Sequence, residues 1–242
     1  MPALEPTILA TSGGYREGHR TELELSALVQ YAVELSGSTG RAPKLTHLCT
    51  ASGDQHAFAG RLSDAARVAG FELINLNLFG MPNVDDVEAH LLDQDVIWVG
   101  GGSVVNLLAV WRAHGLDQIF RRVWQAGVVL GGVSAGSICW FQGGATDSFG
   151  PELRGVTNGL ALLPYGNGVH YDSEARRRPL IHSMVESGEL AETHCTNDGV
   201  GLLYRRTKLV EAVTETEKRG AYIVRNVDGT VTEERLEPRF LS

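Results

Sequence analysis

Cysteine, proline, positive charge and long apolar runs are all scarce in this chain of 242 residues. Its three cysteines, Cys49, Cys139 and Cys195, are too few and too scattered for a disulfide framework or a Cys-x-x-Cys metal site, which favours a reducing compartment such as the cytoplasm. Only 8 residues are proline, while 43% are hydrophobic and 21% charged, a composition that excludes disordered, collagen-like and coiled-coil proteins. We therefore expect a globular protein with a substantial core.

The shortage of basic residues and of apolar runs excludes two classes of partner. Because 21 Lys and Arg face 29 Asp and Glu, the net charge is -8 and no basic footprint for a phosphate backbone is present. No segment approaches 18 consecutive apolar residues, and the first residues lack a basic stretch followed by an apolar run. We expect a cytoplasmic protein that binds neither nucleic acid nor a membrane.

Glycine, in contrast, is abundant, with 29 residues, many of which stand where an apolar run ends. Continuous apolar runs are typical of strands that are covered on both faces, and the segments between them carry helical spacing. Strands alternating with helices predict a mainly parallel sheet in a three-layer α/β/α sandwich. The expected strands are residues 7–11, 45–50, 71–78, 95–99 and 127–133, and the expected helices contain Leu23 to Leu35, Ala57 to Ala66 and Leu107 to Trp111.

The pattern changes after about residue 150. One helical stretch near residues 174–187 is followed by short alternating runs at 200–204, 209–213, 221–224 and 230–232, which predict antiparallel strands near the C-terminus. Because no Pro/Ser-rich or charged linker separates the halves, we expect residues 1–242 to form a single domain.

The first chemical signal is Gly-Val-Ser-Ala-Gly at 132–136, between an expected strand and an expected helix. A sharp turn of this kind needs small neighbours and projects its central side chain, here Ser134, at a helix N-terminus. The pattern alone also fits a glycine-rich turn with a capping serine, but its context favours a nucleophile.

The second signal is the glycine run at 100–102, which also follows an expected strand. Its backbone N–H groups suit a phosphate or a developing oxyanion. A dinucleotide site is disfavoured because the Gly-x-Gly-x-x-Gly spacing and a P-loop lysine are absent. We expect the N–H groups of Gly102 and Ala135 to form an oxyanion hole.

A serine nucleophile needs a base, and the chain has eight histidines. His170 lies in a glycine-rich segment after the serine and before the next helix, which favours it by position. His182 and His194 are the alternatives that the residues leave open.

Taken together, four segments resemble the peptidase E (aspartyl dipeptidase) family, which includes cyanophycinase-like relatives and shares its sheet with class I glutamine amidotransferases. They are Gly-Gly-Gly with Asn-Leu-Leu at 100–108, Gly-Val-Ser-Ala-Gly-Ser-Ile-Cys-Trp at 132–140, Gly-Val-His-Tyr at 168–171 and Asn-Asp-Gly at 197–199. The resemblance covers nearly the whole chain. It implies a serine hydrolase with Ser134 as nucleophile, His170 as base, and Gly102 and Ala135 as oxyanion donors, in the order serine, histidine, acid.

The resemblance places Asp198 as the third member of the triad, where well-known dipeptidases have glutamate. Aspartate is one methylene shorter, so the backbone would have to approach His170 more closely. Two other carboxylates remain as alternatives. Asp172 mimics the His-x-Glu spacing of the amidotransferases, and Asp147 follows the serine closely.

The substrate is expected to be a small peptide or amide, and no cofactor or metal is expected. Arg176 and Arg177, in a run with Arg178, are candidates for binding a substrate carboxylate, although a solvated arginine cluster is equally compatible with the run. The resemblance implies that dipeptidases specific for Asp-X carry a longer insertion after the histidine. Its absence here predicts poor Asp-X cleavage. An Asp-X dipeptidase, an amidotransferase-like domain and a regulatory module without turnover are the alternatives, and a homodimer is compatible with the residues.

Overall fold

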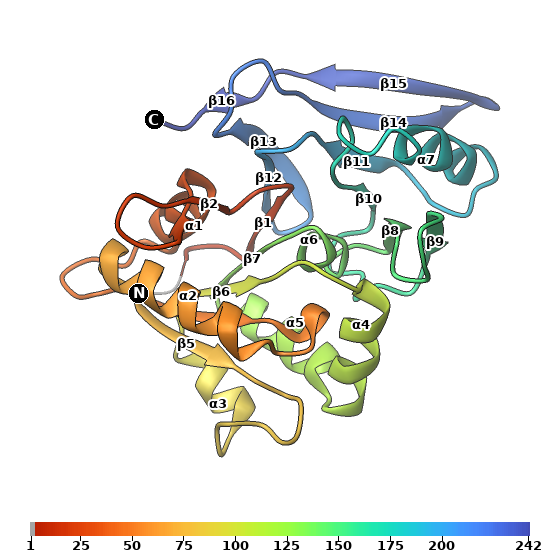
Figure 1. Cartoon of the computed structure of the whole chain (residues 1–242). Helices are drawn as coiled ribbons and strands as arrows, with labels where there is room; N and C mark the ends of the chain where they lie inside the picture. Colours follow the sequence, from red (N-terminus) through yellow and green to blue (C-terminus); the bar gives the residue numbers. More distant parts are fainter. Residues whose placement is uncertain (1–2) are drawn as a thin grey trace.

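The apolar runs of the first half form one large sheet in the computed structural model, which describes residues 3–242 (Figure 1). This main sheet has eight strands in the order β16-β13-β12-β1-β7-β6-β4-β5. Neighbouring strands from β1 to β5 run parallel, whereas β12 pairs antiparallel with both β1 and β13. The strands are β1 (Thr7–Thr11), β4 (Lys44–Leu48), β5 (Glu72–Leu76), β6 (Val96–Val99), β7 (Val129–Val133), β12 (Val200–Arg205), β13 (Lys208–Thr214) and β16 (Arg239–Phe240).

Helices cover both faces of the main sheet because its strands are apolar at successive positions. In β1, Leu9 packs with one group of helices while Ile8 and Ala10 pack with the other. The first group is α1 (Ala27–Ser36) and α2 (His56–Ala69), and the second is α3 (Val87–Leu92), α4 (Val104–Ala113) and α5 (Leu116–Gln125). The α/β class and the mainly parallel sheet predicted from the sequence are thus confirmed.

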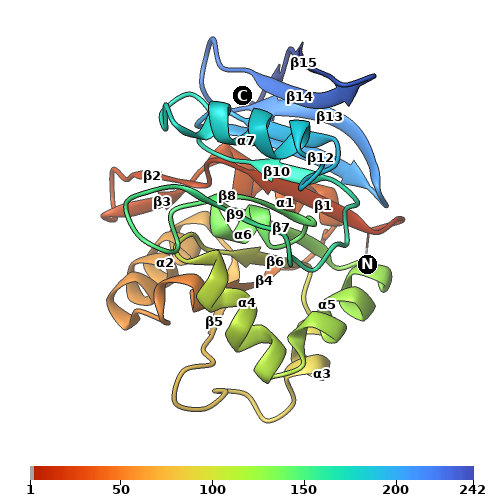
Figure 2. The same cartoon turned by 90° about the vertical axis from the view of Figure 1, so that its right-hand side faces the viewer.

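A second sheet, which the sequence did not predict as a separate unit, carries the later part of the chain. Its six strands lie in the order β15-β14-β11-β10-β8-β9, and α7 (Arg177–Glu186) packs on β14 and β15 (Figure 2). The expected antiparallel strands therefore divide, because β12 and β13 join the main sheet while β14 and β15 join the second. The strands are β8 (Gly143–Thr146), β9 (Arg154–Val156), β10 (Gly166–Gly168), β11 (Thr193–Thr196), β14 (Ala221–Val227) and β15 (Thr230–Leu236).

Three local expectations need correction. Leu23 and Leu25 belong not to a helix but to β3 (Leu23–Leu25), which forms a hairpin with β2 (Tyr15–Glu17) before α1 begins. The last helix begins at Arg177 rather than near 174. The strand expected at 45–50 ends at Leu48 and is followed by the 3₁₀ turn η1 (Thr50–Ser52).

The short helix α6 (Ala135–Ile138) lies where the two sheets meet. It contacts β1, β6 and β7 of the main sheet as well as β8 and β10 of the second sheet (Figure 1). The chain crosses back from the second sheet to the main sheet through residues 197–199, between β11 and β12. The segments predicted to carry catalytic groups therefore come from both sheets and converge beside α6.

Candidate active site

Ser134 occupies a strained turn between β7 and α6. Its φ of 58° and ψ of -116° lie in a region that non-glycine residues rarely adopt. The flanking glycines permit this turn, because a Cβ on Gly132 would lie 2.4 Å from the Gly136 carbonyl oxygen, and one on Gly136 would lie 2.1 Å from that of Val99. This strand-to-helix turn has the geometry that a nucleophile elbow requires.

The glycine loop at 100–102 lies against this turn. A Cβ added to Gly101 would be 3.2 Å from Ser134 Cβ, whereas one on Gly102, whose φ is +134°, would be 2.4 Å from the Ala51 carbonyl oxygen. Gly102 is the oxyanion donor expected from the sequence, whereas Gly101 is the glycine of this loop that lies nearest the serine. Within residues 3–242 the amides of Gly101, Gly102 and Ala135 donate no hydrogen bond, so these N–H groups are available to a ligand.

His170 and Asp198 form a hydrogen-bonded pair. His170 Nδ1–H donates to Asp198 Oδ1 over 2.6 Å. The two residues follow β10 and β11, which are parallel neighbours, so both emerge from the same edge of the second sheet. Their side chains are 30% and 40% exposed, respectively. His170, like Ser134, has a left-handed φ, 52°.

The end of β1 holds these groups together. The Ser134 N–H donates to the Thr11 carbonyl over 3.2 Å, and the His170 N–H donates to Ser12 Oγ over 3.0 Å. The N–H of Gly199, next to Asp198, donates to the Ser12 carbonyl over 3.0 Å. Two consecutive residues thus fix the backbones of all three predicted triad segments. The Ser134 and His170 side chains are not hydrogen-bonded to each other within the described residues, which is common in ligand-free active sites.

The other histidines and carboxylates weighed from the sequence have different partners. His182 Nε2 meets Glu233 over 2.9 Å, and the buried His194 is hydrogen-bonded to Tyr204 and Glu192. Asp172 accepts the N–H of Asp198 over 2.9 Å and pairs with Arg219. Asp147 follows β8, and among residues 3–242 its carboxylate contacts no histidine.

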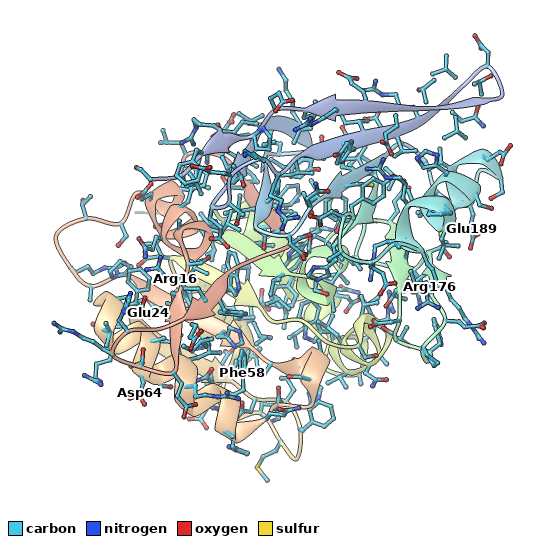
Figure 3. The ribbon with its side chains drawn as sticks, turned by 45° about the horizontal axis from the view of Figure 1, so that its top comes forward. Arg16, Glu24, Phe58, Asp64, Arg176 and Glu189 are labelled. Atoms are coloured by element: carbon cyan, nitrogen blue, oxygen red, sulfur yellow. The ribbon has the colours of Figure 1, made fainter. Side chains whose placement is uncertain are left out.

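The three consecutive arginines have different surroundings. Arg176 is exposed, donates to the Pro151 carbonyl and lies on the opposite side of the view from Arg16 (Figure 3). Arg178 pairs with Glu233 and stacks on Tyr171.

Arg177 is only 5% exposed and donates to the Ala145 carbonyl. Within the described chain it has no carboxylate at ion-pair distance. Burial lowers its pKa, and the charges of Asp147, Glu174 and Asp198 partly oppose that shift.

A buried polar group that was not predicted from the sequence lies beneath the glycine loop. His47 in β4 is 1% exposed, and its ring lies 3.3 Å from the position of a Cβ on Gly100. The Tyr15 hydroxyl meets its Nε2 over 2.7 Å, and Cys49 Sγ lies 3.3 Å from its Nδ1. Burial lowers the pKa of His47 to about 3. The sequence offers only a histidine inside an apolar strand as a signal of this arrangement.

Asp198 also lines a cavity of about 570 Å³, together with Ser12, Tyr15, Arg16, Glu215 and Arg219. Across residues 3–242, no group of three or more His, Cys, Asp or Glu side chains is placed to hold a metal ion. No helix in the same range has both the length and the apolar character needed to cross a membrane.

Comparison with known proteins gives consistent matches. Residues 8–212 match the model of peptidase family S51. The uncharacterized peptidase YgaJ of Bacillus subtilis (strain 168) is 35% identical over 234 residues, which cover 97% of this chain and 98% of that protein.

Two solved structures share the fold. A peptidase from an acI-B1 Actinobacterium superposes with a TM-score of 0.71 at 16% identity, covering 97% of this chain and 95% of its own. A putative peptidase E protein from Listeria monocytogenes EGD-e gives a TM-score of 0.63 at 15% identity, covering 87% of this chain and 98% of its own.

Proposed function

Because this chain belongs to peptidase family S51 and is a serine-type peptidase, we propose that it hydrolyses small peptides or amides with Ser134, His170 and Asp198 as its catalytic triad. The observation that carries this proposal is the 2.6 Å bond from His170 to Asp198, on a segment anchored to the same end of β1 as Ser134.

Each residue has a distinct role in the proposed reaction. Ser134 Oγ attacks the scissile carbonyl while His170 Nε2 takes its proton and later delivers it to the leaving amine. Asp198 holds Nδ1–H, so that Nε2 is the basic nitrogen. Water then attacks the acyl-enzyme with the same base, which restores the serine.

The N–H groups of Ala135 and of the glycine loop would hold the tetrahedral oxyanion. Gly102 remains the donor predicted from sequence, and Gly101 joins it because of its proximity to Ser134. A helix N-terminus, here that of α6, adds favourable electrostatics at the same point.

A cavity adjoins the acid of the proposed triad, since its lining includes Asp198, although it includes neither Ser134 nor His170. Its volume of about 570 Å³ lies within the range of small-molecule sites, roughly 300–1,000 Å³.

Labelling with a fluorophosphonate probe tests the triad. We expect the wild type to be modified at Ser134, and Ser134→Ala to lose both the label and a factor on the order of 10⁶ in turnover because the nucleophile is gone. Ser63→Ala, which removes an exposed hydroxyl from α2, is the control and should still be labelled. An unlabelled wild type that nevertheless binds peptides would point instead to a regulatory module.

Specificity for Asp-X dipeptides is the second candidate, and a single residue favours it. Arg177 is a buried cation without a carboxylate partner in the described chain, whereas Arg176 and Arg178 are engaged with Glu174 and Glu233. We nevertheless expect poor cleavage of Asp-X, because Arg177 is already bonded to the Ala145 carbonyl and almost inaccessible.

Steady-state hydrolysis of Asp-Leu against Ala-Leu and Asn-Leu measures this specificity. We expect Asp-Leu to have the lowest kcat/KM of the three. A value for Asp-Leu of about 10⁴ M⁻¹s⁻¹ or more, lost in Arg177→Met, would establish the Asp-X dipeptidase instead.

A further inference from the structure

A second aspartate beside the triad is fully engaged in holding the first. Asp172 Oδ1 accepts the backbone N–H of Asp198 over 2.9 Å, and Oδ2 pairs with the Arg219 guanidinium. The Asp172 side chain is 18% exposed and makes no hydrogen bond to the His170 ring within residues 3–242. Its two oxygens therefore act on the segment that carries the acid and not on the base.

This contact stands where the pairing of two strands runs out. β10 and β11 pair in parallel as far as Gly168 and Cys195, and the Tyr171 N–H continues the contact by donating to the Thr196 carbonyl over 3.0 Å. At Asp198 the chain turns toward β12, and no backbone carbonyl of the segment after β10 accepts the Asp198 N–H. The Asp172 carboxylate accepts this N–H instead of a backbone carbonyl, so a side chain extends the contact between the two segments past the end of the strands.

The contact made by Asp172 matters because the Asp198 side chain is short. An aspartate reaches about 1.5 Å less than a glutamate because it has one methylene fewer. Asp198 can therefore reach His170 only if the segments 170–172 and 197–199 stay close together. The 2.6 Å bond from His170 Nδ1 shows that they do.

We propose that Asp172, neutralised by Arg219, is a positioning residue that clamps the Asp198 segment to the His170 segment and so allows a short acid to orient the base. The inference rests on the proposed function, since it assigns a part of the same triad. Asp172 neither transfers a proton nor contacts the substrate in this account.

Graded substitutions test the clamp. Asp172→Ala should lower kcat by about 10²-fold with little change in KM, because a misplaced catalytic group costs about that much. Asp198→Ala should cost up to about 10⁴-fold, as when a triad acid is lost. Asp172→Asn keeps an oxygen for the Asp198 N–H and loses only the ion pair. The kcat of this variant and that of Arg219→Gln should each stay within about tenfold of the wild-type value.

Compensation separates positioning from a general structural role. In the wild type, Asp198→Glu should lower kcat, because the clamp fixes the distance between the two segments and the longer side chain would displace its carboxylate from His170 Nδ1. In the Asp172→Ala background the same change should raise kcat about tenfold, since the extra methylene restores reach. An equal effect of Asp198→Glu in both backgrounds would overturn the proposal, as would an Asp172→Ala enzyme with unchanged kcat.

An NMR measurement does not depend on turnover. The downfield resonance of the His170 Nδ1–H proton should be present in the wild type and in Asp172→Asn, and lost in Asp172→Ala. Persistence of that resonance in a folded Asp172→Ala protein also contradicts the clamp. Failure of fluorophosphonate labelling at Ser134 together with loss of the resonance in Asp172→Ala would reject the proposed function and leave the clamp standing.

Discussion

Two residues of the candidate site, Ser134 and His170, have left-handed backbones although neither is glycine. Such conformations cost on the order of 1–3 kcal/mol each and persist only where the surrounding structure enforces them. Here the enforcement comes from hydrogen bonds of both N–H groups to the end of β1 and, for Ser134, from the close approach of Gly136 to Val99. These two are among seven non-glycine residues with positive φ in the described chain, and they are the two that belong to the proposed triad.

Removing this strain should stabilise the protein at the expense of activity. We expect Ser134→Gly to raise the free energy of unfolding by about 1 kcal/mol relative to Ser134→Ala, because glycine adopts the turn without a Cβ penalty and only part of the gain is lost to backbone entropy. Both variants lack the nucleophile, so they differ only by the Cβ methyl group and its effect on the backbone. Urea denaturation provides the measurement, and equal midpoints for the two variants would show that the turn is not strained.

At the scale of elements, two glycines in the loop between β6 and α4 have different structural roles. Gly101 faces the serine, whereas Gly102 passes against η1, where the Ser103 N–H donates to the Ala51 carbonyl over 2.8 Å. The first glycine leaves space at the site and the second allows two elements to pack.

Alanine at Gly101 should therefore affect reactivity, whereas alanine at Gly102 should affect stability. Gly101→Ala should reduce fluorophosphonate reactivity by tenfold or more while keeping the thermal midpoint within about 2 °C, because the new methyl group would stand over Ser134. Gly102→Ala should lower the free energy of unfolding by about 2 kcal/mol or more, since its Cβ would meet backbone atoms and its φ is unfavourable. A stable Gly102→Ala protein would contradict the packing role.

The same scale explains what the sequence could and could not predict. Apolar runs in the sequence predicted the five strands of the first half, and each lies within a few residues of its predicted place, although β5 at the edge of the sheet is fully buried only at Leu76. β10 and β11 did not, because Gly-Asn-Gly and Thr-His-Cys-Thr carry neither apolar alternation nor β-branched enrichment in a long enough run. The second sheet was consequently missed, and with it the reason that His170 and Asp198 meet.

Residues were predictable where local chemistry marked them. Ser134 was marked by its glycines, and His170 by position and resemblance. The burial of Arg177 and His47 was not predictable, because both depend on contacts between elements that are distant in sequence. The resemblance favoured Asp198 over Asp172 and Asp147 but left all three open, and the structure adds that the Asp198 carboxylate is hydrogen-bonded to the His170 ring.

For the whole molecule, the buried His47 links acidity to stability. Its pKa is about 3 in the folded protein and about 6.5 when exposed, so between these values the unfolded chain binds a proton that the folded chain does not. Stability therefore falls as the pH decreases through 6.5. The contribution of this one group to the free energy of unfolding should fall by about 2 kcal/mol between pH 7 and pH 5.

Replacing His47 should remove this contribution. We expect His47→Gln to be less stable than the wild type at pH 7 but to lose about 2 kcal/mol less on going to pH 5, as measured by chemical denaturation at both values. The exposed His114→Gln serves as the control and should follow the wild type. If His47→Gln instead tracked the wild type at both values, His47 would have to be protonated in the folded state.

The junction of the two sheets has a consequence for catalysis. Ser134 follows β7 of the main sheet, while His170 and Asp198 follow β10 and β11 of the second. The distance between Ser134 and His170 therefore depends on how the two sheets pack against each other. A displacement between the sheets that breaks no strand would separate the nucleophile from the base and abolish hydrolysis. Hydrolytic activity should therefore be lost at lower denaturant concentrations than the circular dichroism signal, although the serine is chemically unchanged.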